Sequence, residues 1–202
     1  MDEAERERVR RLPPGPHGIP PELVARNQRE RLVAAMAEVC AEQGYGATSV
    51  ADVARHAGVS TASFYRQFKD KRECMLASFE ELLERLVEEV ERACAEEAAP
   101  AAKGATAIGT AASLLAADLP AARLLSIEVL AVGPEGVRFQ QDAIERLAGR
   151  LREARQPSGD SPPSFPSAEW VTLAAMVSLV AKRVAEGKSP DPAELEALSA
   201  RL

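Results

Sequence analysis

Residues 44–75 read GYGATSVADVARHAGVSTASFYRQFKDKRECM, and this stretch decides the fold of the chain. Thr48 and Ser49 are side chains that commonly cap a helix N-terminus, and Asp52 places a carboxylate in the first turn that follows them. Gly58 favours the left-handed backbone with which many helices end. The stretch therefore begins with one short helix, bounded by a cap at its start and a glycine at its end.

A second helix is predicted directly after that glycine. Ser60 supplies its N-cap, and the helix should run from Thr61 to Phe68. Two short helices joined by so tight a turn form a helix-turn-helix, whose second helix enters the major groove of DNA. We therefore expect residues 44–75 to contain a DNA-binding motif.

The same stretch resembles the DNA-binding motif of the TetR family of bacterial transcriptional regulators. The matching positions are Gly44-Tyr45, Thr48-Ser49-Val50, Val53-Ala54, Ala57-Gly58-Val59-Ser60, Phe64-Tyr65, Phe68-Lys69, Lys71 and Glu73. The preceding helix, from about residue 21 to residue 43, is similar as well, so the resemblance covers roughly residues 25–80. It implies a three-helix DNA-binding head and a helical second domain that binds an effector and forms a homodimer.

The composition of the 202-residue chain favours helices throughout. Hydrophobic residues make up 46% of the sequence, which is enough for a buried core, whereas aromatic residues make up 4%. Alanine-rich segments favour closely packed helices, and no long run alternates β-branched and polar residues. We therefore predict an all-α fold in three parts. These are a flexible N-terminal arm at residues 1–21, the helix-turn-helix DNA-binding head at 22–69, and a ligand-binding and dimerisation domain at 70–202.

The formal net charge of -6 is distributed unevenly along the chain. Residues 1–72 contain 12 basic and 10 acidic side chains, whereas residues 73–202 contain 13 and 21. A locally basic module on an acidic body is compatible with DNA binding, because the local field attracts phosphates. Because the excess of two charges is within ordinary scatter, the charge alone does not decide the function.

The cysteines and the apolar segments indicate a cytoplasmic protein. Cys40, Cys74 and Cys94 are far apart and fall on apolar helical positions, which favours buried, reduced thiols over disulfides or a metal site. The N-terminal segment MDEAERERVRR lacks the apolar core of a signal peptide. The longest apolar stretch, residues 170–181, is too short to cross a bilayer, so we expect no membrane association.

The N-terminal arm allows two interpretations. Arg6, Arg8, Arg10 and Arg11 are suited to a minor groove beside the head, as in the arms of some helix-turn-helix proteins. Four acidic side chains in the same segment favour a tail whose charges cancel. The prolines and glycines of residues 12–21 argue against a helix there.

A long helix should join the head to the rest of the chain. Asp70 and Glu73 form an Asp-x-x-Glu version of a capping box, and the helix that they begin should reach about Ala98. Its apolar positions recur every three or four residues, and the glutamates between them should face water. Because this helix would start in the head and end in the second domain, we expect it to link the two mechanically.

Further helices are predicted at residues 105–117, 119–132, 135–155, 168–186 and 192–202, with a Pro/Ser-rich loop at 156–167. The helix at 168–186 is apolar around most of its circumference, so it needs cover on two sides. A homodimer through residues 168–202 would supply that cover, and a central position within the monomer is the alternative. The resemblance implies the dimer, because TetR-family members pair through their last two long helices.

Eight residues of the helix-turn-helix are candidates for DNA contact. They are Thr48, Ser49, Ser60, Thr61, Ala62, Ser63, Tyr65 and Lys69. The first residues of a recognition helix approach base edges, whereas hydroxyl, amide and lysine groups bind phosphates. The resemblance implies phosphate contacts for Tyr65 and Lys69. It also implies that Thr61 stands where the family often has a cation, which leaves thymine methyls as partners for Thr61 and Ala62. For Ser60 and Ser63, local capping is the alternative role. Arginines at positions 26, 29 and 31 are suited either to phosphates or to water.

A ligand cavity is expected among the helices of the second domain. Its candidate lining residues are Phe79, Leu83, Leu86, Leu115, Ile127, Glu128, Phe139, Trp170, Leu173 and Met176. The apolar members also suit an ordinary core. Glu128 lies inside the apolar run 124–132, where three roles are open: holding a cationic or hydroxylated ligand, facing water, or pairing with Arg123.

The sequence contains no constellation typical of an enzyme. His17 and His56 fit no Ser-His-Asp arrangement, and there is no phosphate-binding glycine loop and no zinc-ligand spacing. We therefore predict a homodimeric repressor that binds a palindromic operator on double-stranded DNA and is released by a small-molecule effector, without a cofactor or metal. Two alternatives remain: a constitutive DNA-binding regulator without a ligand, and a helical interaction protein with a vestigial head.

Overall fold

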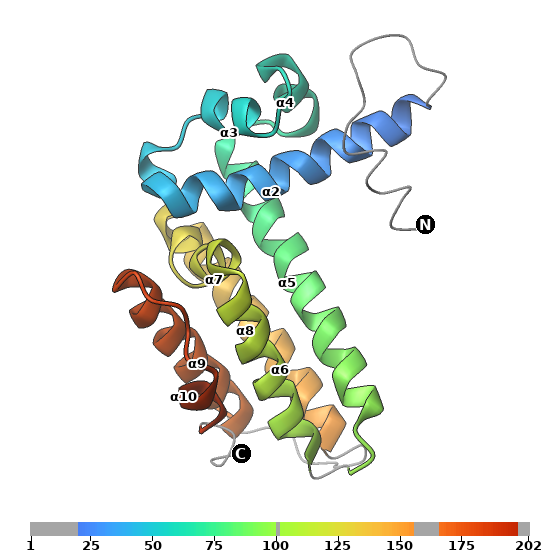
Figure 1. Cartoon of the computed structure of the whole chain (residues 1–202), viewed down its shortest axis with the longest axis vertical. Helices are drawn as coiled ribbons and strands as arrows, with labels where there is room; N and C mark the ends of the chain where they lie inside the picture. Colours follow the sequence, from blue (N-terminus) through green and yellow to red (C-terminus); the bar gives the residue numbers. More distant parts are fainter. Residues whose placement is uncertain (1–19, 100–101, 156–165, 198–202) are drawn as a thin grey trace.

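The computed structural model describes residues 20–99, 102–155 and 166–197, and these residues contain helices and no strand (Figure 1). The elements are α2 (Pro21–Ala47), α3 (Val50–His56), α4 (Thr61–Gln67), α5 (Lys71–Glu96), α6 (Lys103–Ala117), α7 (Leu119–Ser126), the 3-10 helix η2 (Glu128–Val132), α8 (Pro134–Arg155), α9 (Ala168–Ala185) and α10 (Pro192–Glu196). The all-α fold is confirmed. The predictions for the arm at 1–19, for residues 156–165 and for residues 198–202 lie outside the described residues.

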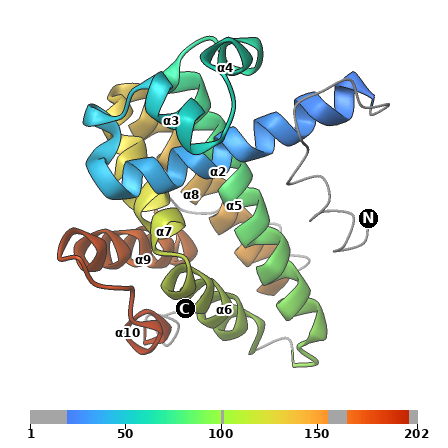
Figure 2. The same cartoon turned by 45° about the horizontal axis from the view of Figure 1, so that its top comes forward.

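The helix-turn-helix lies at one end of the molecule, where α3 and α4 pack against α2 (Figures 1 and 2). Phe64 and Phe68 form the centre of this head, buried and with ring centroids 5.6 Å apart. Gly44 interrupts α2 with a φ of 79°, and Gly58 makes the turn between α3 and α4 with a φ of 63°. These two backbone positions favour glycine over any residue with a Cβ atom.

A capping box fixes the start of α3. Ser49 Oγ accepts a hydrogen bond from Asp52 N at 3.2 Å, and Asp52 Oδ2 accepts one from Ser49 N at 3.0 Å. The hydrogen bonds from Ser49, and then the one from Arg55, lower the pKa of the Asp52 carboxyl to about 2. The helix-turn-helix therefore begins at a defined residue, as its sequence predicts.

Replacing Ser49 by alanine should raise the pKa of Asp52 towards its ordinary value of about 3.9, because the carboxylate loses its hydroxyl donor. The lost cap should also lower the free energy of unfolding by about 1 kcal/mol. NMR titration of the Asp52 carboxyl and urea denaturation measure these two effects. Ser60→Ala removes the cap of α4 instead and is the control, since it should leave the Asp52 pKa unchanged. The same pKa in Ser49→Ala and in the wild type would contradict the assignment.

The long helix α5 runs from the head along the length of the body, as the sequence predicts (Figure 1). It contacts α2 in the head and α6 in the body. Asp70 Oδ1 caps it by accepting from Glu73 N at 2.8 Å, but Glu73 Oε2 accepts from Lys69 N rather than from Asp70 N. One of the two hydrogen bonds of the predicted capping box therefore forms as expected. In the other, the donor is the backbone N of Lys69, one residue before Asp70.

The single helix predicted over residues 119–132 is instead two elements, α7 and η2, which separate at Ile127. Ile127 leaves the helical conformation with a φ of -123°, and Gln140 of α8 donates to a carbonyl group at the end of α7. Gly136 allows the start of α8 to approach η2, since a Cβ at this position would lie 1.9 Å from Val129 O. The break is therefore produced by packing against α8, which the local sequence does not reveal.

Two buried clusters stabilise the chain, and the first of them joins the head to the body. It contains Phe64 and Phe68 together with Leu124 of α7 and Val129 of η2. The second cluster lies within the body and includes Met176 and other residues of α6, α7, α9 and α10. Because head and body share the first core, a displacement of α7 or η2 acts on the head directly.

The three cysteines are free, and two of them are buried as the sequence predicts. Burial raises the pKa of the Cys40 thiol to about 11 and that of the Cys74 thiol to about 12. Cys94 is partly buried, and burial raises its pKa as well. Thiols with such pKa values are inert at neutral pH, which is consistent with a packing role.

Within the described part of the chain, no single helix has the length and apolar composition needed to cross a membrane. One pair, α6 with α7, meets both conditions when its two members are taken together, and it is bent by 111° at the junction.

Candidate DNA-binding surface and effector cavity

Six of the eight residues predicted to contact DNA have exposed side chains. They are Ser49, Ser60, Thr61, Ala62, Tyr65 and Lys69. Tyr65 is 60% exposed although its ring also packs against the edge of Phe64, with the centroids 5.5 Å apart. The N-termini of α3 and α4 therefore present hydroxyl groups and backbone amides to solvent, which suits contacts with phosphates and base edges.

Thr48 and Ser63 differ from the other six, because their side chains are buried. Thr48 is 3% exposed and its hydroxyl donates to Gly44 O at 2.8 Å. Ser63 is 5% exposed and its Oγ lies 3.1 Å from Ser60 Oγ. We therefore assign both side chains to hydrogen bonds that stabilise the local turns, rather than to contact with DNA.

Arg66 is an exposed cation on α4 that was not among the eight residues predicted to contact DNA. It follows Tyr65 directly, and its Nη2 donates to Ser63 Oγ at 2.7 Å. This bond holds the guanidinium close to the N-terminal half of α4, where Thr61 supplies no charge. The signal available in the sequence was its place in the recognition helix, one residue after a candidate phosphate contact.

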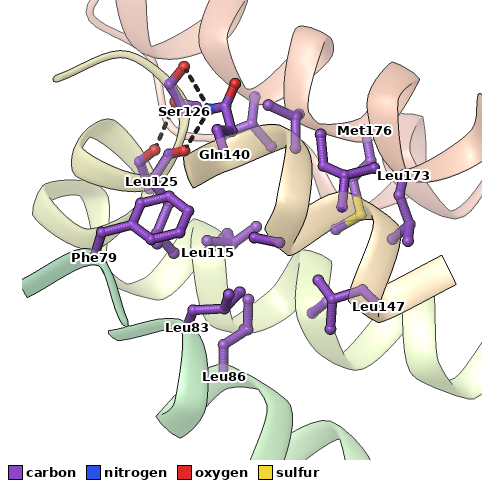
Figure 3. A pocket seen from close by; sticks show the side chains of 16 residues that line it. Phe79, Leu83, Leu86, Leu115, Leu125, Ser126, Gln140, Leu147, Leu173 and Met176 are labelled. Atoms are coloured by element: carbon purple, nitrogen blue, oxygen red, sulfur yellow. Dashed lines mark hydrogen bonds between the residues drawn. The ribbon is translucent and has the colours of Figure 1, made fainter. Parts of the chain in front are cut away.

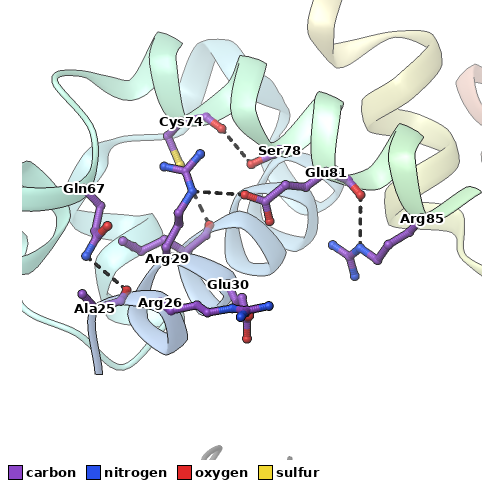
Figure 4. Close-up of polar contacts among 10 residues, drawn as sticks. Ala25, Arg26, Arg29, Glu30, Gln67, Cys74, Ser78, Glu81 and Arg85 are labelled. Carbon is purple, nitrogen blue, oxygen red and sulfur yellow. Dashed lines mark hydrogen bonds and ion pairs between the residues drawn. The ribbon is translucent and has the colours of Figure 1, made fainter. Parts of the chain in front are cut away.

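The arginines of α2 are engaged within the head. Arg29 Nε lies 3.2 Å from Glu81 Oε1 (Figure 4). The guanidinium carbon of Arg29 lies 4.6 Å from the centroid of the Phe68 ring. Burial raises the pKa of Glu81, and the charge of Arg29 opposes this effect. Arg26 pairs with Glu30 at 3.1 Å. Arg29 therefore helps to fix α2 on α5, whereas the ion pair of Arg26 lies within α2 itself.

Two adjacent apolar cavities lie in the body, with volumes of about 100 Å³ and about 190 Å³. Side chains of α5, α6, α8 and α9 line both cavities. Residues of α7 contribute to the first cavity, which Figure 3 shows. The two cavities share the lining residues Leu86, Ala111, Leu147, Leu173 and Met176. Their walls extend along α5 from Phe79 to Cys94, a distance of about 22 Å at the usual helical rise. The site is therefore long, narrow and almost entirely apolar.

The structure brings six of the ten predicted lining residues to these cavities. They are Phe79, Leu83, Leu86, Leu115, Leu173 and Met176. The other four, Ile127, Glu128, Phe139 and Trp170, do not line either cavity. Phe139 packs against Phe79 instead, with ring centroids 5.6 Å apart, and Ile127 belongs to the second core cluster. Glu128 is 4% exposed and pairs with Arg123 at 2.8 Å, so the ion-pair interpretation is confirmed for it.

The ends of this long site differ in polarity. At the end near the head, Gln140 Nε2 donates to Leu125 O at 2.7 Å and faces Ser126 O at 3.4 Å (Figure 3). At the other end, Arg150 lines the second cavity and pairs with Glu91 at 2.9 Å on the exposed surface. An amphiphilic ligand would place its apolar chain between these ends and its polar group near the exposed arginine.

This chain is similar in sequence and in fold to bacterial regulatory proteins. Residues 32–78 match the model of the tetR family of bacterial regulatory proteins. The fatty acid metabolism regulator protein of Bacillus subtilis (strain 168) is 32% identical over 121 residues, which cover 60% of this chain and 61% of that protein. The match therefore spans about three-fifths of the length of this curated relative.

Two solved structures share the fold of most of this chain. The fatty acid degradation regulator FadR from Bacillus halodurans superposes with a TM-score of 0.73 at 19% identity, covering 85% of this chain and 95% of that one. FadR from Bacillus subtilis in complex with stearoyl-CoA gives a TM-score of 0.69 at 24% identity, with the same coverage. Residues 32–78 therefore form a DNA-binding head of the tetR family of bacterial regulatory proteins, and the chain as a whole shares the fold of these two regulators.

Proposed function

We propose that this chain is a homodimeric transcriptional repressor that binds a palindromic DNA operator and is released by a long-chain acyl ligand such as an acyl-CoA. The observation that carries the proposal is that α5 contacts both parts of the molecule. It packs against α2 of the head, and its later turns line the apolar cavities. One helix therefore contacts both the candidate DNA-binding head and the candidate effector cavities.

The shape of the cavities supports an effector with a long hydrocarbon chain. Each cavity is smaller than the roughly 300–1,000 Å³ of ordinary small-molecule sites, and the two approach that range only when joined. Joining them requires the shared side chains, including Leu147 and Met176, to move apart. A similar protein, FadR from Bacillus subtilis, has been solved with stearoyl-CoA, a ligand of this shape.

The exposed apolar side chains of α8 and α9 support a homodimer. Val137 of α8 is 39% exposed and Val171 of α9 is 49% exposed, and the two helices pack against each other. Small residues on the less buried part of α9, Ala174, Ala175 and Ser178, permit close approach of a second copy. A dimer would present two heads to the DNA, and such a pair reads two half-sites of a palindromic operator about one helical turn or more apart.

Lys69→Ala and Thr61→Ala should affect DNA binding in different ways. Loss of the exposed lysine should weaken binding to all sequences and reduce the slope of log affinity against log salt by about 1, because one phosphate contact disappears. Thr61→Ala should leave the slope unchanged and alter the preferred base at one position of each half-site. Binding titrations on selected and scrambled DNA, at several salt concentrations, measure both effects. Equal effects of the two variants on every sequence would contradict this division of roles.

Selection of DNA from a random pool, followed by ligand titration, tests the proposed function. Recovery of a two-fold symmetric site is the expected first result, and weaker binding to that site after addition of stearoyl-CoA is the expected second result. Enrichment of no sequence would favour an interaction protein. A selected site whose affinity does not respond to acyl-CoA esters of several chain lengths would favour a constitutive regulator.

A further inference from the structure

The backbone that leads into the helix-turn-helix is held from two sides. Gly44 breaks α2 there, and the chain then passes through Tyr45 and Thr48 to the cap of α3. Lys71 Nζ, at the start of α5, donates to both Tyr45 O and Thr48 O at 2.7 Å, and it lies 4.1 Å from the centroid of the Tyr45 ring. Lys71 therefore fixes this turn from the side of α5.

Glu128 fixes the same turn from the side of the body. Its Oε2 accepts from Tyr45 N at 2.7 Å, although the two residues are 83 positions apart in the chain. Its Oε1 accepts from Arg123 Nε of α7 at 2.8 Å. A carboxylate with only 4% exposure is costly to bury, and these two charge-assisted bonds compensate that cost at this position.

The residues just before Glu128 form the wall of the first cavity. Leu125 and Ser126 line it, and Gln140 lines it while donating to Leu125 O (Figure 3). A ligand that pushes on this end must move the end of α7, and η2 begins only two residues later. Only Ile127 separates this wall from Glu128, and the Glu128 carboxylate is bonded to the backbone of the DNA-binding head.

We propose that Glu128 is the positioning residue that transmits occupancy of the apolar cavity to the helix-turn-helix, through its bond to Tyr45 N. In the structure described here, the bond holds the turn before α3 against η2. Movement of η2 pulls this turn away from Lys71 or breaks the bond, and both changes disturb the orientation of α3 and α4. This inference rests on the proposed function, since it requires an effector in the cavity and an operator at the head.

Glu128→Gln tests the inference, because glutamine keeps the shape of the side chain and removes its charge. Glu135→Gln is the matched control: Glu135 also pairs with a cation near the head, Arg72, but its side chain is 41% exposed and its partner lies on α5, outside the turn. For each protein, operator affinity is measured with and without saturating stearoyl-CoA, and the ratio of the two dissociation constants is the coupling factor. Binding of stearoyl-CoA is measured separately without DNA.

We expect Glu128→Gln to reduce the coupling factor by about 2- to 30-fold, the range seen for residues that carry coupling. Glu135→Gln should keep the wild-type factor. A merely structural role would lower the stability of Glu128→Gln without changing this ratio, so an unchanged ratio in a folded, ligand-binding variant would overturn the inference. If Glu128→Gln does not fold, Arg123→Gln decides the question, since it removes only the cation that holds the carboxylate in place.

The same measurements distinguish failure of this inference from failure of the proposed function. A wild-type protein whose operator affinity does not respond to stearoyl-CoA would overturn the proposed function, and this inference with it. A wild-type protein that responds while Glu128→Gln responds equally would overturn the inference alone.

Discussion

Phe64→Ala should lower the free energy of unfolding by about 3–5 kcal/mol, which is the range for removal of a fully buried phenylalanine. The ring is completely buried between Tyr65 and Phe68, and it lies in the cluster that joins the head to α7 and η2. Because the void would open in the core that the head shares with α7 and η2, we expect loss of DNA binding together with loss of stability. Urea denaturation and operator titration measure the two losses on the same protein.

The neighbouring Tyr65 is the natural control for this variant. Its side chain is 60% exposed, so Tyr65→Ala should change the free energy of unfolding far less than Phe64→Ala. It should nevertheless weaken operator binding, because an exposed ring and hydroxyl on the recognition helix are lost. A Tyr65→Ala protein that binds the operator as tightly as the wild type would remove Tyr65 from the DNA-binding surface. A Phe64→Ala protein of normal stability would contradict the description of the core.

Ala111→Phe should abolish the response to acyl ligands while preserving operator binding. Ala111 of α6 lines both cavities, so a phenyl ring at this position occupies the passage through which a long chain must run. We expect the dissociation constant for stearoyl-CoA to rise by about 100-fold or more, which corresponds to about 2.7 kcal/mol. Overpacking should lower stability by about 1–3 kcal/mol, so ligand binding is measured at a temperature well below the unfolding transition.

Ala117→Phe is the matched control, because it adds the same ring to an exposed position of the same helix. Calorimetric titration with stearoyl-CoA should give the wild-type affinity for Ala117→Phe and weak or absent binding for Ala111→Phe. Equal affinities for the two variants would place the ligand outside these cavities. Loss of operator binding in a folded Ala111→Phe protein would show that the ring disturbs the head as well.

The head could be predicted from the sequence because its determinants are local. Ser49, Asp52, Gly58 and Ser60 act on backbone within three residues of themselves, and the apolar spacing in α4 places Phe64 and Phe68 on one face. Burial of Thr48 and Ser63 was not predictable in the same way. Their short polar side chains satisfy neighbouring groups in the turn instead of facing outward, and a sequence pattern does not distinguish these two orientations.

The effector site could be predicted only in part, because its geometry depends on contacts between distant helices. The spacing of Leu83 and Leu86 on α5 pointed to the cavity, whereas the break after α7 depends on Gln140 of another helix. The sequence identified Glu128 as a polar residue within an apolar run and suggested its pairing with Arg123. It contained no sign of the bond to Tyr45, which tertiary packing alone brings within reach.

Coupling between the cavity and the head is tested most directly by the complete thermodynamic cycle of operator and stearoyl-CoA binding. The operator affinity is measured with and without stearoyl-CoA, and the stearoyl-CoA affinity is measured with and without operator. If the cavity and the head are coupled, each ligand weakens binding of the other by the same factor, about 5-fold or more. Binding of stearoyl-CoA in the cavity that leaves the operator affinity unchanged would contradict this coupling.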